Sequence, residues 1–142
     1  MGKKRIVKKG GDTDAAKRGV SSRAPRRRLD VGVLYVEATY NNTKVSLSDT
    51  IGNIVLWSSS GSLGFSGAKK ATPFAAARVA EAVVEKVKKI GVQDVAVRVS
   101  GVGSGRDSAV RALANHGLNI ISIKDITPIP HNGPRAKKVR RV

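Results

Sequence analysis

Alternating apolar and polar positions predict three consecutive β-strands in the first half of this 142-residue chain. Residues 31–40 are rich in β-branched and aromatic side chains, which are enriched in strands. The pair Asn41-Asn42 suits the hairpin turn after them, because asparagine tolerates a positive φ. Residues 43–49 alternate strictly and predict a half-exposed strand, and residues 54–59 predict a third. Strands joined by such short turns form an antiparallel meander. The positions expected on the exposed face of the second strand are Lys44, Ser46 and Ser48.

The apolar spacing then changes to three and four, which predicts a helix over residues 72–90. Thr72 and Pro73 are typical of the N-cap and the first helical position, where proline's missing N–H costs nothing. Gly91 is typical of the residue that ends a helix. The positions expected to face inward are Ala76, Val79, Ala80, Val83, Val87 and Ile90.

A strand, a shorter helix and a last strand complete the pattern over residues 94–100, 107–116 and 118–124. The order β-β-β-α-β-α-β predicts a mixed five-stranded sheet with two helices packed against it. We therefore expect one α/β domain over residues 31–125. The inward-facing residues expected in the second helix are Val110, Leu113 and Ala114, and the aromatic residues expected in the core are Trp57 and Phe74.

Most of the charge lies outside this predicted domain. The chain has 27 Lys and Arg residues against 10 Asp and Glu, a formal net charge of +17. Residues 1–30 carry +8 and residues 126–142 carry +5, which leaves +4 for the domain. A chain this basic most often binds a polyanion, and nucleic acid is favoured over membrane because no basic amphipathic helix stands out. We expect two basic tails, the first disordered alone and ordered along phosphates.

Composition excludes several classes of protein. The chain has no cysteine, which excludes a disulfide scaffold and a thiolate metal site. Its two histidines, His116 and His131, are too few for a histidine-based metal cluster. No apolar run approaches the roughly 18 residues of a membrane-spanning helix. The basic N-terminus lacks the apolar stretch of a secretory signal, so we expect a cytoplasmic protein without metal or cofactor.

Two other hypotheses stay open at this point. A nuclease is conceivable because Glu37 and Asp49 lie on neighbouring predicted strands and could face each other, although a two-metal site needs several converging carboxylates. Charge alone also fits a protein that condenses any nucleic acid. No Ser/His/Asp arrangement indicates a nucleophile, and we expect no enzyme.

Two glycine-rich loops carry the most specific signal. Residues 101–106 place three glycines between a strand and a helix, so that backbone N–H groups could face an anion and Arg106 could grip a phosphate. The alternative is a tight connection that needs small residues. Lys69 and Lys70 close a glycine- and serine-rich loop over residues 60–72, whose Phe65 could stack on an RNA base or merely anchor the loop.

Four motifs in this order resemble the family of the eleventh protein of the small ribosomal subunit, in its bacterial type, over about residues 28–142. Each motif alone is weak, and the combination is highly specific. The motifs are Asn41-Asn42-Thr43, residues 64–76 (GFSGAKKATPFAA), residues 101–106 (GVGSGR) and residues 125–133 (DITPIPHNG).

The resemblance implies a ribonuclease-H-like fold without its catalytic carboxylates. It also implies a place on the platform of the small subunit, where the protein bridges helices of 16S-type rRNA and lines the cleft for the messenger and its Shine–Dalgarno pairing. The neighbours that it implies are the seventh and eighteenth small-subunit proteins and, in bacteria, the twenty-first protein and the third initiation factor.

Both lines of reasoning predict that rigid glycine loops and basic tails contact rRNA, through shape and 2′-hydroxyl groups more than a base code. The expected rRNA-binding residues are Arg26, Arg27, Arg28, Asn42, Lys69, Lys70, Gly103, Gly105, Arg106, His131, Asn132, Arg135, Lys137, Lys138, Arg140 and Arg141.

Overall fold

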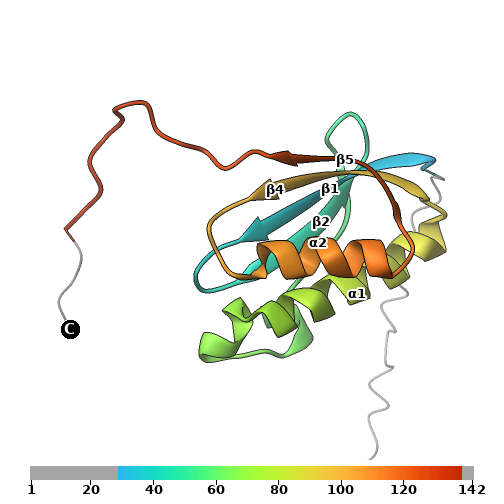
Figure 1. Ribbon diagram of the computed structural model, residues 1–142, viewed down its shortest axis with the longest axis horizontal. Helices are drawn as coiled ribbons and strands as arrows, with labels where there is room; N and C mark the ends of the chain where they lie inside the picture. The colour runs from blue at the N-terminus through green and yellow to red at the C-terminus, as the bar shows by residue number, and fades with distance from the viewer. Residues whose placement is uncertain (1–28, 139–142) are drawn as a thin grey trace, which may run out of the picture.

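Five strands and two helices form the folded part of the chain in a computed structural model that describes residues 29–138 (Figure 1). They follow each other in the predicted order, which confirms the expected α/β fold. Five of the expected rRNA-binding residues, Arg26, Arg27, Arg28, Arg140 and Arg141, lie outside the described residues. The elements are β1 (Val31–Ala38), β2 (Thr43–Ser48), β3 (Ile54–Ser59), α1 (Pro73–Ile90), β4 (Asp94–Ser100), α2 (Gly105–Asn115) and β5 (Asn119–Asp125).

The strands form one mixed sheet in the order β3-β2-β1-β4-β5. β2 pairs antiparallel with β1 and with β3, which confirms the meander. β4 pairs parallel with β1 and with β5. Four strands therefore run in one direction and only β2 runs against them. As a result, β1, β3, β4 and β5 all end at the same edge of the domain.

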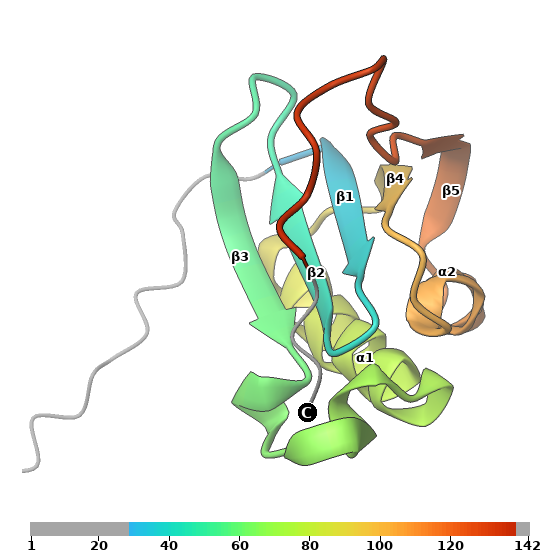
Figure 2. The same ribbon diagram turned by 90° about the vertical axis from the view of Figure 1, so that its left-hand side faces the viewer.

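Both helices cover the same face of the sheet (Figures 1 and 2). α1 packs against β2 and β3, α2 packs against β1 and β4, and the helices pack against each other. Two right-handed crossovers that advance in the same direction across a sheet place their helices on one side. The buried side chains between the two layers include Leu34, Val36, Val45, Leu47, Val79, Val83, Val87, Val95, Val97 and Leu113.

The ends of α1 are those that the sequence predicts. The hydroxyl of Thr72 accepts a hydrogen bond from the N–H of Ala75 at 3.3 Å, and Pro73 is the first helical residue. Gly91 ends the helix with a φ of +94°, a conformation that side chains with a Cβ disfavour. Every residue of the predicted apolar stripe is buried except Ile90, which is half-buried.

The prediction for α2 is wrong in the first residue of the helix and in the burial of Ala114. The helix begins at Gly105, two residues earlier than expected, and Ala114 is exposed. Its buried face follows the spacing of three and four through Ala109, Ala112 and Leu113. Ala114 lies one further helical step, about 100°, from Leu113 and so turns towards solvent.

The predictions for two aromatic residues are also wrong, since the side chains of Trp57 and Phe74 are 55% and 63% exposed. Trp57 lies on the face of the sheet that the helices leave open, because its neighbours in β3 face the other way: Leu56 packs against the core and Ser58 is buried. Phe74 lies in the first turn of α1, where Ala75 and Ala76 occupy the buried positions.

The open face of β2 is less exposed than its alternation predicts. Ser46 and Ser48 are buried, whereas Lys44 is half-buried as expected for a rim position. Ser46 is aligned with Tyr35 on β1 and Trp57 on β3, and these larger side chains flank the small serine. Small polar residues can therefore be buried on a face that no helix covers.

Candidate nucleic-acid interface

One end of the domain brings together most of the loops that the sequence singles out. We call it the carboxyl end, because β1, β3, β4 and β5 finish there, and it comprises residues 39–42, 60–72, 101–104 and 126–127. It lies on the left of Figure 1 and faces the viewer in Figure 2. Both helices also begin at this end. In sheets with parallel strands, ligands usually bind at this end.

Positive charge and helix polarity coincide at the carboxyl end. The segment that carries Lys69 and Lys70 forms a 3₁₀ turn, Gly67–Ala71, directly before α1. The hydroxyl of Ser104 donates to the carbonyl of Ala71 at 3.0 Å and ties this segment to the start of α2. Unpaired N–H groups give each helix start a partial positive charge of roughly +0.5. The loop is thus a folded, positively polarised surface that suits an anion.

Phe65 anchors the loop of residues 60–72 to the domain, which was the alternative to stacking on an RNA base. Its half-buried ring meets the ring of Phe74 edge to face, with 6.2 Å between the centroids. The guanidinium of Arg78 lies 5.4 Å from the centroid of the same Phe74 ring. Phe65 therefore belongs to a small aromatic cluster at the side of the loop.

The turn after β1 holds a residue that the sequence analysis missed. The hydroxyl of Thr39 accepts from the N–H of Asn42 at 3.1 Å, and the N–H of Thr39 donates to the carbonyl of Asn42 at 2.9 Å. Tyr40 is held on this tight turn with its side chain 77% exposed. The available signal was an aromatic residue directly before two turn-forming asparagines. The side-chain oxygen of Asn42 is buried, and no residue in the described part of the chain donates a hydrogen bond to it.

None of the three glycines at the start of α2 and in the loop before it has room for a side chain, since Gly101 and Gly103 lie against the backbone after β1 and Gly105 lies against the side chains of Thr43 and Ala76. A Cβ on Gly101 would lie 2.1 Å from the carbonyl oxygen of Ala38, and one on Gly103 would lie 2.3 Å from that of Thr39. A Cβ on Gly105 would lie 2.6 Å from the hydroxyl oxygen of Thr43. The contacts support the interpretation as a tight connection that needs small residues. The N–H of Gly103 donates to Ala38 at 2.8 Å and therefore does not point to an external anion.

Arg106 bonds within the chain. Its guanidinium donates to the carbonyl of Gly101, to the carboxylate of Asp125 and, at 3.4 Å, to the hydroxyl of Thr127. The hydroxyl and N–H of Thr127 donate to Asp125 at 2.6 and 2.8 Å. The residue expected to grip a phosphate is thus part of a bonded cluster at the root of the C-terminal tail.

These bonds hold the pKa of Asp125 well below its ordinary value of 3.8. The hydrogen bond from the Thr127 hydroxyl contributes most, followed by the Arg106 guanidinium. A carboxyl group with a lowered folded-state pKa stabilises the fold fully above its unfolded-state pKa, and that contribution is lost as the pH falls through the folded-state value. Asp125 is therefore ionised at neutral pH and available to Arg106.

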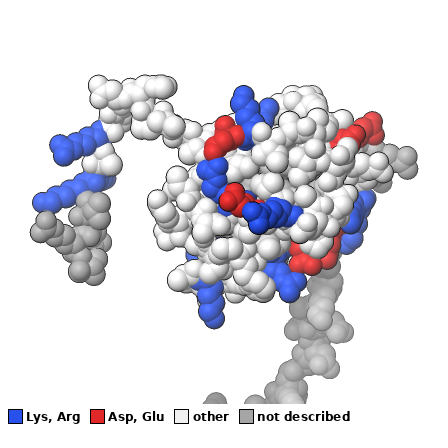
Figure 3. Space-filling view, viewed as in Figure 1, with Lys and Arg blue, Asp and Glu red and all other residues white. Residues whose placement is uncertain are grey.

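The first part of the C-terminal tail, residues 126–138, leaves the domain at the carboxyl end in extended form (Figure 1). No Asp or Glu occurs in it, and the space-filling view shows its Lys and Arg side chains apart from the mixed charges of the domain (Figure 3). Asn132 has a φ of +53°, which marks a turn within the tail. The exposed residues of the tail that were expected to bind rRNA are His131, Asn132, Arg135, Lys137 and Lys138.

The carboxylates proposed for a nuclease do not meet. Glu37 forms an ion pair with Lys44 at 3.4 Å, near the carboxyl end of β1. Asp49 lies at the opposite end of the sheet, where it accepts hydrogen bonds from the N–H groups of residues 51–53. Within residues 29–138, no three His, Cys, Asp or Glu side chains lie together in an arrangement that could hold a metal ion.

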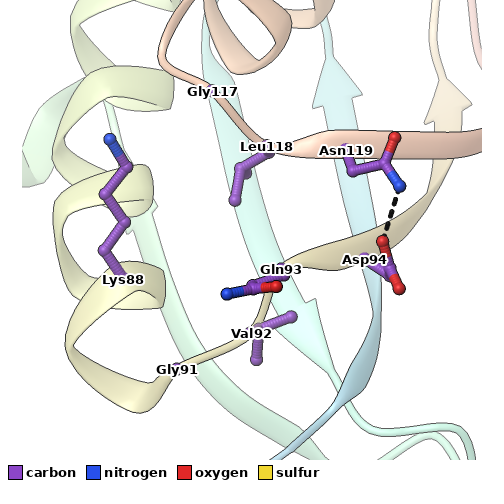
Figure 4. A pocket seen from close by; sticks show the side chains of 8 residues that line it. All are labelled: Lys88, Gly91, Val92, Gln93, Asp94, Gly117, Leu118 and Asn119. Atoms are coloured by element: carbon purple, nitrogen blue, oxygen red, sulfur yellow. Dashed lines mark hydrogen bonds between the residues drawn. The ribbon is translucent and has the colours of Figure 1, made fainter.

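A pocket at the end opposite to the carboxyl end offers no alternative site (Figure 4). It lies between the last turn of α1 and the starts of β4 and β5. Its one carboxylate, Asp94, accepts a hydrogen bond from Asn119 at 2.6 Å.

Among the described residues, no helix is both long and apolar enough to cross a membrane.

Comparison with known proteins decides the family. The family model described as "Ribosomal protein S11" matches residues 32–141. The chain belongs to the ribosomal protein S11 family. It is 51% identical over 128 residues to "Small ribosomal subunit protein uS11" of Solibacter usitatus, which covers 90% of this chain and 95% of that protein. The proteins of the same name from Nitratiruptor sp. and Helicobacter pylori are 46% and 45% identical over 129 and 130 residues, covering 90% and 89% of this chain and 99% of each relative.

Membership of the S11 family confirms the resemblance seen in the four motifs. It confirms a structural role in the ribosome rather than an enzymatic one, and the nuclease hypothesis is therefore wrong. The matched range includes the turn after β1, both glycine-rich loops and nearly all of the C-terminal tail. Arg26, Arg27 and Arg28 precede it.

Proposed function

We propose that this S11 protein binds 16S-type rRNA on the platform of the small subunit, bridges rRNA helices there and lines the cleft for the messenger and its Shine–Dalgarno pairing. It acts in the cytoplasm as part of the ribosome. Its neighbours in this proposal are the seventh, eighteenth and twenty-first small-subunit proteins, with the third initiation factor and the messenger close by.

The carboxyl end supports this proposal because positive groups of three kinds gather there. Lys69 and Lys70 supply full charges, the starts of α1 and α2 supply partial charges, and the tail supplies Arg135, Lys137 and Lys138. Phosphate oxygens accept from all of these groups, and each neutralised phosphate releases a counterion. The folded part gives a fixed surface, and the tail extends the contact beyond it.

The points where the two tails join the domain support the bridging role. The N-terminal arm joins at the start of β1, whereas the C-terminal tail leaves from the end of β5. Because β1 and β5 run in the same direction, these points lie at opposite ends of the domain. Two rRNA helices repel each other through their phosphates, and basic segments placed between them offset that repulsion. Arg26, Arg27 and Arg28 would serve one contact region and the C-terminal cations the other.

Binding of the purified full chain to folded small-subunit rRNA tests this function. We expect a clear preference for the rRNA over an RNA duplex of equal length at equal salt, with a linear fall of log K against log salt. Equal affinity for both RNAs would instead favour a protein that condenses any nucleic acid. Absence of binding to either RNA would contradict the proposal outright.

Tyr40 provides a local prediction at this interface. Its exposed ring on a rigid turn suits stacking on an unpaired base, which is typically worth about 1–3 kcal/mol per base. Tyr40→Leu is therefore expected to weaken rRNA binding by roughly 5- to 150-fold without lowering the thermal midpoint. Tyr40→Phe keeps the ring and should bind like the wild type. Equal affinity of the leucine variant and the wild type, measured by filter binding, would show that Tyr40 makes no stacking contact.

A further inference from the structure

The C-terminal tail is fastened to the domain by a compact set of hydrogen bonds at its root. The N–H of Ile126 donates to the carbonyl of Val99 at 2.8 Å, which continues the pairing of β4 and β5 beyond the last strand residue. The hydroxyl of Thr127 donates to Asp125 and accepts from the N–H of Gly101 at 3.2 Å. Three separate segments, the loop before α2, the end of β5 and the tail, therefore meet at Thr127.

Arg106 closes this set from the first turn of α2. Its guanidinium reaches Gly101, Asp125 and Thr127, and its side chain is only 29% exposed. Asp125 balances its positive charge directly, and Figure 3 shows acidic and basic side chains next to each other where the tail leaves the domain. Because Asp125 offsets the charge of Arg106 and neighbouring groups already accept its N–H bonds, Arg106 attracts an external phosphate only weakly.

The residues directly after Thr127 are stiff enough for the bonds at Thr127 to set the direction in which the tail leaves the domain. Among residues 128–138, no hydrogen bond fastens the tail to the domain beyond Thr127. Pro128 and Pro130 follow directly, and each proline fixes its own φ and restricts the residue before it. A segment that alternates with proline is extended and fairly stiff. The direction set at Thr127 is therefore kept as far as Pro130, and it determines where the turn at Asn132 and the basic residues after that turn begin.

We propose that Arg106, Asp125 and Thr127 form a latch that aims the basic end of the tail at its rRNA site, so that Arg106 is a positioning residue and not a phosphate contact. This inference rests on the proposed function, since the aimed tail matters only if it binds rRNA. In this proposal the acidic residue Asp125 promotes the binding of a polyanion, because it helps to hold the tail in place.

The latch makes a prediction whose sign differs from that of simple electrostatics. Asp125→Asn removes a negative charge, which on charge alone tightens RNA binding and would also free Arg106 for a phosphate. If the latch aims the tail, the same variant binds folded small-subunit rRNA more weakly, on the order of 10-fold near 0.15 M salt. Glu85→Gln is the matched control, because it removes the same charge from an exposed position on α1. It should bind at least as tightly as the wild type.

A second variant shows whether Asp125→Asn weakens rRNA binding through the cations of the tail. The neutral-tail variant carries Arg135→Gln, Lys137→Gln and Lys138→Gln in the full chain. Added to that variant, Asp125→Asn should weaken binding far less than it does with the wild-type tail, by no more than about threefold, because only Arg140 and Arg141 are left in the tail to aim. Thr127→Val removes the hydroxyl without changing any charge and should behave like Asp125→Asn in both backgrounds.

The experiment is salt-dependent filter binding of these full-length variants, with amide hydrogen exchange of Ile126 and Thr127 measured on the free proteins. We expect both latch variants to weaken binding much more with the wild-type tail than with the neutral tail, together with faster exchange at the two amides and thermal midpoints close to that of the wild type. Tighter binding of Asp125→Asn, or equal losses in both backgrounds, would overturn the latch. Failure of the wild type to bind the rRNA would instead contradict the proposed function, and unchanged exchange in the variants would still overturn the latch by itself.

Discussion

Gly101→Ala is expected to destabilise the domain more than most single substitutions in its loops. Its φ of +95° is costly for a residue with a Cβ, by about 1–2 kcal/mol. The added Cβ would also lie 2.1 Å from the carbonyl oxygen of Ala38, and relieving such an overlap typically costs about 1–3 kcal/mol. Because the strands β1 and β4 meet at this point, neither backbone can move alone.

Urea unfolding of the purified variants measures this effect as a change in the free energy of unfolding. Gly91→Ala is the matched control, since Gly91 has a φ of +94° and a Cβ added there would meet no atom within 4 Å. It should lose only the conformational term of about 1–2 kcal/mol. Equal losses at the two positions would show that the close approach of the two backbones contributes nothing.

Neutralising Arg135, Lys137 and Lys138 in the C-terminal tail is expected to have the largest effect on rRNA binding. The neutral-tail variant loses three cations that form no ion pair within residues 29–138. Each phosphate contact contributes about 0.7–0.9 to the salt slope, so the slope should fall by about two to three units. The affinity near 0.15 M salt should fall roughly 100-fold. Filter binding over a range of salt concentrations gives both numbers.

A control of equal charge separates this contact from the effect of net charge. Lys86, Lys88 and Lys89 are exposed near the end of α1, on the side of the domain away from the tail. Replacing all three with glutamine removes the same charge as the neutral-tail variant. The slope should then change by less than about one unit. Equal salt slopes for the two triple variants would show that rRNA binding depends on the net charge of the protein and not on contacts made by the tail.

Features fixed by neighbouring residues could be predicted from the sequence. The N-cap at Thr72, the proline after it and the glycine that ends α1 act through bonds within one helical turn, so the bounds of that helix followed directly. The meander followed from alternation and turn-forming residues for the same reason. These local preferences agree with the final fold.

Features that depend on which face is covered could not be predicted in the same way. Trp57 is a large aromatic residue in a strand, and only the crossover of both helices to one side leaves it exposed. Ser46 is buried by its partners on the two adjacent strands, which alternation along one strand cannot show. Side-chain burial in a sheet therefore needs the tertiary arrangement.

The candidate site shows the same limit. The sequence indicated that Arg106, at a helix start, could grip a phosphate, whereas its partner Asp125 lies 19 residues later at the end of β5. The parallel pairing of β4 with β5 brings the two together. Tyr40 was missed although it directly precedes the turn-forming pair Asn41-Asn42, because an aromatic residue at such a place can be either exposed or buried.

Sedimentation of a bacterial lysate that contains the tagged full chain shows whether the protein is incorporated into the small ribosomal subunit. We expect the chain to sediment with the small subunit at moderate salt, and the neutral-tail variant to shift towards the top of the gradient as salt is raised. A wild-type chain found in the ribosome-free fractions at moderate salt would contradict this incorporation.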